Sequence, residues 1–265
     1  MNTKHVASDL EAVLPLHNLI NLIILIPPLN IINNIDNVQP PPIPSPAHPL
    51  PPGSPPRRVK HPGILPPALN LHHPLNRLIH TLMRDKFIAL EKDKCHFIYQ
   101  LARILHTTTI VEAGTSYGVS TIYLALAVTD NLAAAATPGK GTVIATEYEP
   151  AKAEQARKHW AECGETVSSV IDLREGDLQE TLKTNLPDQV DMLLLDIWTP
   201  MALPALKLVQ PKLRYGAVVV ADNTLSSAEG YKGLLEYVRA PGSGFSTLTL
   251  PYKGGLEMSV YLPRR

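Results

Sequence analysis

Residues 109–120 read TIVEAGTSYGVS, and this stretch decides the fold. A short apolar run at 109–113 enters a turn that contains Gly114 and Gly118, and a helical segment follows. The two glycines let the backbone turn tightly and approach a ligand closely. The pattern is not G-x-G-x-x-G, so the fingerprint of a dinucleotide-binding turn is absent. An acid beside the first glycine, Glu112, favours a cationic or hydroxyl-bearing ligand over a pyrophosphate.

Strand and helix signals alternate along the rest of the chain. Further strands are expected at 142–146, 170–173, 190–195, 217–221, 246–250 and 256–262, and helices at two places within 69–105 and at 119–128, 151–163, 201–209 and 226–238. Five strand-then-helix units in series predict an α/β fold with a doubly wound, mostly parallel sheet of seven strands. The last two strands are too close for a parallel crossover, so they should be antiparallel.

The N-terminal part of the chain has a different composition. Seventeen of the 26 prolines fall within residues 1–74, and residues 40–56 read PPPIPSPAHPLPPGSPP. Such a run favours an extended linker over a helix or a central strand. We therefore expect a helical and proline-rich extension at 1–65, which could act as an oligomerisation arm of a homodimer, and a folded domain at 66–265. The apolar run at 19–26 is too short to cross a membrane, so no membrane partner is expected.

Charge and cysteine content narrow the class of protein. The chain has 24 basic and 24 acidic residues, so its formal net charge is zero, and a nucleic-acid partner is not expected. Cys95 and Cys163 form neither a CxxC pair nor a metal-binding spacing. This usage fits a reducing compartment, and we expect a cytoplasmic protein.

Acidic residues stand where the predicted strands end, which is the ligand-binding edge of such a sheet. Glu147 ends the second strand, in the usual place for a carboxylate that binds ribose hydroxyls. Asp177 follows the third strand, where it could contact a ligand or equally cap the next helix. Asp196 ends the fourth strand, and Asp222 and Asn223 end the fifth. Together these three side chains offer an all-oxygen site for Mg²⁺, unless they are hydrogen-bonded residues of turns.

From about residue 88 to residue 262 the chain resembles the catechol O-methyltransferase type of class I S-adenosylmethionine-dependent methyltransferases. The stretches that carry the resemblance are EAGTSYGVS, ATEYEP, EGDLQ, DMLLLDIW, AVVVADNT and GGLE. The resemblance implies a Rossmann-like methyltransferase domain. It also implies transfer of a methyl group from S-adenosylmethionine to a hydroxyl of a small, catechol-like or phenolic acceptor, with Mg²⁺ assistance.

The resemblance assigns roles to individual residues. The cofactor would be bound by Leu90, Glu112, Gly114 and Ser120 at its methionine end, by Glu147 at its ribose, and by Leu178, Gln179 and Trp198 around its adenine. Further cofactor contacts would come from Thr115, Gly118, Asp177 and Asp196. Mg²⁺ would be held by Asp196, Asp222 and Asn223. The catalytic residues would be Asp196 and Glu257, of which Glu257 contacts the second hydroxyl of the acceptor.

One departure from the family keeps alternatives open. The catechol enzymes place a lysine base three residues after the first metal aspartate, and here Thr199 stands at that position. Either the metal alone acidifies the hydroxyl, or Lys232, Lys253 or a histidine supplies the base. The alternatives are a metal-independent methyltransferase of another small molecule or an RNA base, and a non-catalytic scaffold that keeps the fold. The missing G-x-G-x-x-G counts against a nicotinamide dehydrogenase.

Overall fold

The computed structural model describes residues 89–135 and 139–264. Several expectations fall outside these residues: the extension at 1–65 with its short apolar run, the homodimer through it, the domain start at 66, and the first helix expected after residue 69. Within the described residues, no helix is long and apolar enough to cross a membrane. Cys95 and Cys163 are both free thiols.

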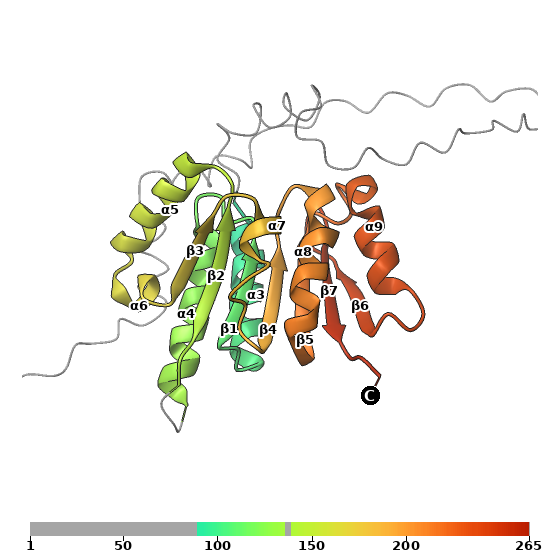
Figure 1. Ribbon diagram of the computed structural model, residues 1–265, viewed down its shortest axis with the longest axis horizontal. Helices are drawn as coiled ribbons and strands as arrows, with labels where there is room; N and C mark the ends of the chain where they lie inside the picture. The colour runs from blue at the N-terminus through green and yellow to red at the C-terminus, as the bar shows by residue number, and fades with distance from the viewer. Residues whose placement is uncertain (1–88, 136–138, 265) are drawn as a thin grey trace, which may run out of the picture. The chain divides into compact units, whose positions relative to one another are not determined.

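The described chain forms one seven-stranded sheet in the order β3-β2-β1-β4-β5-β7-β6 (Figure 1). The strands are β1 (Thr109–Ala113), β2 (Thr142–Glu147), β3 (Ile171–Glu175), β4 (Val190–Leu195), β5 (Leu213–Asp222), β6 (Phe245–Leu250) and β7 (Leu256–Tyr261). The first five strands pair in parallel, and β7 is antiparallel to both β5 and β6. The predicted fold class is therefore confirmed, with the last strand reversed.

Helices alternate with most of the strands along the chain and cover the faces of the sheet (Figure 1). They are α3 (Lys92–Ile104), α4 (Val119–Ala134), α5 (Pro150–Glu162), α6 (Glu165–Ser168), α7 (Leu178–Thr181), α8 (Ala202–Val209) and α9 (Ala228–Arg239), with 3-10 turns η2 (Thr199–Met201) and η3 (Gln210–Lys212) flanking α8. α3 packs on α4, and α8 packs on α9. The short helices α6 and α7 were not expected, because four residues leave no periodic pattern in a sequence.

Alternation along the central strands assigns each side chain to a face. Ala221 of β5 packs in a core cluster with residues of α8 and α9, such as Leu206 and Leu234. Successive side chains of a strand point to opposite faces. Asp222, the next residue, therefore points to the other face, which α3 and α4 cover. This division decides which strand-end residues can meet.

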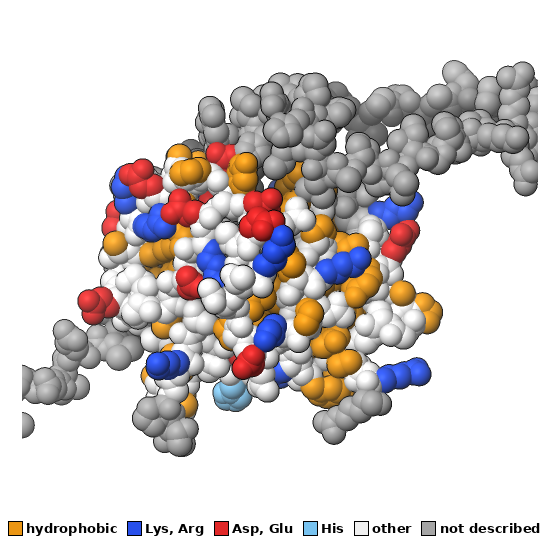
Figure 2. Space-filling view, viewed as in Figure 1, with side chains coloured by type: hydrophobic (Ala, Val, Ile, Leu, Met, Phe, Trp, Pro, Cys, Tyr) orange, Lys and Arg blue, Asp and Glu red, His pale blue; other side chains and the backbone are white. Residues whose placement is uncertain are grey.

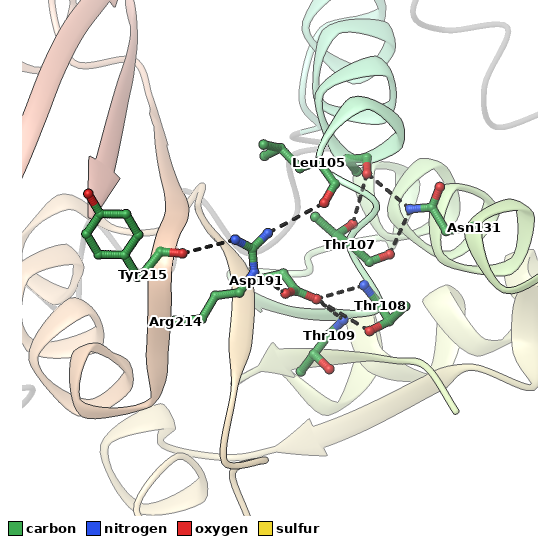
Figure 3. A network of polar contacts seen from close by, with 9 residues as sticks. Leu105, Thr107, Thr108, Thr109, Asn131, Asp191, Arg214 and Tyr215 are labelled. Carbon is green, nitrogen blue, oxygen red and sulfur yellow. Dashed lines mark hydrogen bonds and ion pairs between the residues drawn. The ribbon is translucent and has the colours of Figure 1, made fainter. Parts of the chain in front are cut away.

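A polar network fixes α3 at the edge where the parallel strands begin (Figure 3). Asp191 of β4 accepts hydrogen bonds from the backbone N–H groups of Thr108 (2.8 Å) and Thr109 (2.9 Å), and it pairs with Arg214 of β5. Arg214 also donates to the carbonyl of Leu105, at the end of α3 (3.5 Å). One carboxylate thus ties α3, β1 and β5 together. The other end of α3 is consequently directed to the edge where the strands finish.

We expect Asp191→Ala to lower the free energy of unfolding by about 2–4 kcal/mol, because two backbone donors and a partly buried guanidinium lose their acceptor. The measurement is urea unfolding at neutral pH. Asp188→Ala is the matched control, since Asp188 pairs with Lys212 while its side chain is 98% exposed. The control should unfold at the wild-type urea concentration. Equal unfolding midpoints for the two variants would contradict the assignment.

Candidate active site

The predicted site residues gather at the edge of the sheet where the parallel strands finish. In the pairing register, the ends of β2, β1, β4 and β5 lie side by side. The strand order reverses between β1 and β4, because the chain first builds outward to β3 and then returns to the other side of β1. Ligands of doubly wound sheets bind at such a switch point. The site is therefore centred on the turn after β1 and the end of β4.

The turn after β1 presses against the end of β4. Gly114 has a φ of 97°, and a β-carbon there would lie 2.1 Å from the carbonyl oxygen of Asp196. Gly118 has a φ of 79°, and a β-carbon there would collide with the ring of Trp160. Trp160 also donates its Nε1–H to the Gly118 carbonyl (3.0 Å). Both glycines are thus required by close packing. The sequence analysis missed Trp160, whose only signal was an aromatic residue in a polar-faced helix.

Glu112 is the buried centre of a hydroxyl cluster beside this turn. Its carboxylate accepts hydrogen bonds from Ser120 (2.5 Å), Thr121 (2.5 Å) and Thr115 (3.0 Å). Burial raises the pKa of Glu112 above its usual value, although the three hydroxyl donors oppose that rise. The structure therefore brings together Glu112, Thr115 and Ser120, as predicted, and adds Thr121. The cluster fixes the first turn of α4 against the end of β1.

Glu147, the last residue of β2, is buried and braces the same turn. Its Oε2 accepts from the backbone N–H of Ser116 (2.7 Å), and its Oε1 accepts from the backbone N–H of Glu149 (2.8 Å). Burial raises the pKa of Glu147, while these backbone donors act in the opposite direction. Each carboxylate oxygen can accept a second hydrogen bond. Glu147 can thus hold the turn and still bind hydroxyls.

The residues expected around an adenine occupy two neighbouring segments. Asp177 caps α7, because its Oδ1 accepts from the backbone N–H of Gln179 (2.9 Å). The side chain of Leu178 packs in the hydrophobic core, whereas Gln179 is partly exposed. Trp198 is half-buried against the same core cluster. The helix-cap alternative for Asp177 is confirmed, and contact of this group with a ligand stays a prediction.

Asp196 and Asp222 meet at the ends of β4 and β5. The two strands pair Leu195 with Ala221, so the following aspartates are neighbours across the gap. Burial, followed by the negative charge of Asp222, raises the pKa of Asp196 to about 8. Within the described residues, the Asp196 side chain has no hydrogen-bond partner. Two carboxylates so close together create a demand for positive charge.

Lys94 supplies one such charge and was missed by the sequence analysis. Its Nζ lies 2.6 Å from Asp222 Oδ1 and 2.7 Å from Glu91 Oε2, and the residue is fully buried. Burial alone would lower the pKa of the ammonium, but the two carboxylates outweigh it and raise that pKa. A signal was present, because Lys94 stands on the apolar face of α3 with Ile98 and Ala102. Leu90, the predicted cofactor contact, lies buried just before this helix.

Asn223 completes the predicted metal set only in part. Its Nδ2–H donates to Asp222 Oδ2 (2.9 Å), and its Oδ1 accepts from Ser226 Oγ (3.3 Å). Across the described residues, no three or more His, Cys, Asp or Glu side chains form a group that could hold a metal ion. The predicted set contains two carboxylates and one amide, so it has only two ligands of these four residue types. The structure brings Asp196, Asp222 and Asn223 together, with Asp222 already hydrogen-bonded at both oxygens.

Glu257 lies on the wrong face of the sheet for its expected role. It stands opposite Ala221 in the β5–β7 register, and directly opposed residues point to the same face. Its buried carboxylate pairs with Arg239 of α9 (2.8 Å) and accepts from Thr249 of β6. The carboxylate of Asp222 points to the other face. The structure therefore does not bring Glu257 to Asp196 and Asp222, because strand alternation separates them.

Thr199, which replaces the family lysine, is held by a glycine. A β-carbon on Gly230 of α9 would lie 1.9 Å from Thr199 Oγ1, so the threonine packs directly against the helix backbone. A hydroxyl is a poor base near neutral pH. The other two candidate bases, Lys232 and Lys253, are exposed.

Three comparisons place this geometry among known proteins. Residues 111–224 match a protein-family model described as "Methyltransferase domain". A catechol O-methyltransferase from Niastella koreensis is 30% identical over 145 residues, which is 52% of this chain and 59% of that protein. The chain spans less than two thirds of the length of the curated relatives that it matches.

Solved structures agree on the fold. The O-methyltransferase from Bacillus cereus, in complex with S-adenosylhomocysteine, superposes with a TM-score of 0.58 at 19% identity, over 70% of this chain and 88% of its own. The O-methyltransferase TomG from Streptomyces achromogenes, in complex with S-adenosylmethionine, gives 0.58 at 23% identity, over 69% and 86%. Sheet order, glycine turn and family match all support the resemblance seen in the sequence. Residues 111–224 therefore match a methyltransferase domain, and the described chain has the fold of the solved O-methyltransferases.

Proposed function

We propose that this protein transfers a methyl group from S-adenosylmethionine to a hydroxyl of a small, catechol-like or phenolic acceptor, with Mg²⁺ assistance. One observation carries the proposal: Asp196 and Asp222 meet at the strand ends beside the glycine turn, and Glu147 contacts the same turn from β2. A cofactor gripped by the turn would thus lie next to an oxygen-rich pair of carboxylates. The reaction needs that adjacency.

The residues of the turn fit the cofactor. Glu147 keeps acceptor capacity for ribose hydroxyls, and the cluster around Glu112 lies beside the turn, where the methionine end is expected. When bound, S-adenosylmethionine supplies a methyl group on a sulfonium, which is already a good leaving group. The protein's task is alignment of oxygen, methyl and sulfur, which can contribute about 7–11 kcal/mol.

The strand-end carboxylates fit a divalent cation in donor type and in charge. Asp196 lacks a hydrogen bond among the described residues, and burial, followed by the negative charge of Asp222, raises its pKa. Mg²⁺ would be held by Asp196 and Asp222, with Asn223 joining through its carbonyl oxygen. Its contribution there would be Lewis acidity toward the acceptor hydroxyl. Because Thr199 stands where the family has a lysine, no lysine base at this position would help to deprotonate the acceptor hydroxyl.

Metal-independent transfer is the second candidate, and Lys94 is the observation that favours it. A buried ammonium already lies 2.6 Å from Asp222. Transfer to a panel of catechols and phenols, assayed with Mg²⁺ and then with excess chelator, separates the two candidates. A non-catalytic scaffold would be shown by calorimetry in which S-adenosylhomocysteine does not bind.

The distribution of charged side chains on one face of the protein supports a small-molecule acceptor. On the face shown in Figure 2, acidic and basic side chains of the described residues are interspersed, and these residues form no continuous basic patch there. A nucleic-acid partner would need such a patch to bind phosphates.

We expect Glu147→Gln to weaken binding of S-adenosylhomocysteine at least tenfold, or about 1.4 kcal/mol, because charged hydrogen bonds to the ribose are replaced by neutral ones. Isothermal titration calorimetry gives the affinity. The control is Glu149→Gln, which makes the same charge change two residues along, and it should bind as wild type does. Unchanged affinity in Glu147→Gln would remove this residue from the cofactor site.

Asp222→Asn should reduce Mg²⁺-dependent turnover by about 100-fold while it changes the affinity for S-adenosylhomocysteine little, because Asp222 faces the acceptor side of the site. Initial rates against Mg²⁺ concentration test this, with a melting curve to show that the variant is folded. Full wild-type activity in the presence of chelator would reject the metal and favour the second candidate.

Glu257→Gln should lower the melting temperature and leave the specificity constant kcat/KM close to the wild-type value, because the carboxylate binds Arg239 and Thr249 on the far face. Both quantities are measured on the same preparation. A large loss of kcat at an unchanged melting temperature would restore Glu257 to the acceptor site.

A further inference from the structure

Lys94 is a buried lysine that touches the proposed site. Its side chain is 1% exposed, and its ammonium is shared between Asp222, which is 2% exposed, and Glu91, which is 46% exposed. Lysine is almost never fully buried unless it is paired. Glu91 lies just before α3, and Asp222 ends β5. The contact between Lys94 and Asp222 therefore joins residues that are 128 positions apart in the sequence.

The position of this ammonium is fixed from both ends of α3. At the far end, Leu105 is bound by Arg214 within the Asp191 network (Figure 3). At the near end, the apolar neighbours Cys95 and Ile98 are fully buried. Lys94 is itself buried, and its ammonium is held by Asp222 and Glu91. Asp222 has a permanent positive neighbour.

Charge near the strand ends is nevertheless unbalanced. Asp222 and Glu91 share the one ammonium of Lys94, and the carboxyl of Asp196 lies beside Asp222 without a contact to that ammonium among the described residues. A divalent cation would relieve this excess, but it would have to bind an Asp222 carboxylate whose Oδ1 is already held. Lysine and metal thus compete for one group.

We propose that Lys94 is a positioning residue whose ammonium acts as the built-in counter-ion of Asp222, so that it holds this carboxylate in place and weakens divalent-cation binding there. Glu91 moderates the effect by drawing on the same ammonium. The inference rests on the metal part of the proposed function. According to this inference the cation binds weakly and exchanges, because Lys94 already holds the Asp222 carboxylate in place.

The test measures binding of Mn²⁺ alone, without acceptor, by the loss of its free electron paramagnetic resonance signal. Lys94→Met should bind Mn²⁺ at least tenfold more tightly than wild type, because the competing positive charge is gone. Glu91→Gln should bind about threefold more weakly, because Asp222 then has the ammonium to itself. Asp93→Asn is the matched control, since it removes the same charge from the same turn of α3 but contacts only the backbone N–H of Lys94. It should bind as wild type does.

Each outcome decides the inference. Unchanged or weaker Mn²⁺ binding by folded Lys94→Met overturns it, as does an equal effect of Glu91→Gln and Asp93→Asn. Because Glu91 is half exposed, its variant carries the test if Lys94→Met does not give a cooperative melting curve. Absence of Mn²⁺ binding in wild type and all variants overturns the inference together with the metal part of the proposed function. Calorimetry with S-adenosylhomocysteine and methyl transfer under chelation then report separately on the methyltransferase itself.

Discussion

The ion pair between Lys94 and Asp222 is the interaction on which the arrangement of the site depends. It joins the first described helix to the end of the last parallel strand, and both partners are buried. Breaking one partner of a buried pair leaves an uncompensated charge, which is strongly unfavourable. This one contact holds the Asp222 carboxylate and fastens the start of α3 to the strand ends, while the Asp191 network fastens the other end of α3.

Strand alternation determines which strand-end acids can act together. Asp222 follows Ala221, and their side chains point to opposite faces of the sheet. The face of Asp222 is shared with Glu112, whose partners come from α4, whereas the face of Ala221 is shared with Glu257, whose partner comes from α9. A family resemblance transfers a residue type along the chain, but the register of β5 and β7 decides where that residue points. This is why the structure brings Asp222, but not Glu257, to Asp196 at the strand ends.

Much of the fold could be predicted from the sequence, since buried parallel strands leave continuous apolar runs such as 190–195 and the glycine turn follows the first of them. The first residues of β5, from Leu213 to Gly216, could not be predicted. Their pairing with β4 shifts register between Val190 and Met192, and Gly216 has a φ of 77°. Lys94 could be recognised only as a misplaced charge on an apolar helix face. Its partner lies 128 residues away, and no local pattern encodes such a contact.

The two edges of the sheet handle buried charge in opposite ways. At the edge where strands begin, Asp191 is surrounded by backbone donors and Arg214, so its charge is fully met and serves stability. At the edge where strands finish, burial, followed by the negative charge of Asp222, raises the pKa of Asp196 to about 8. Acids with strongly shifted pKa values cluster at functional sites. Helix α3 reaches both edges. The Asp191 network that fastens its last residues therefore also helps to hold Lys94 against Asp222 at the other edge.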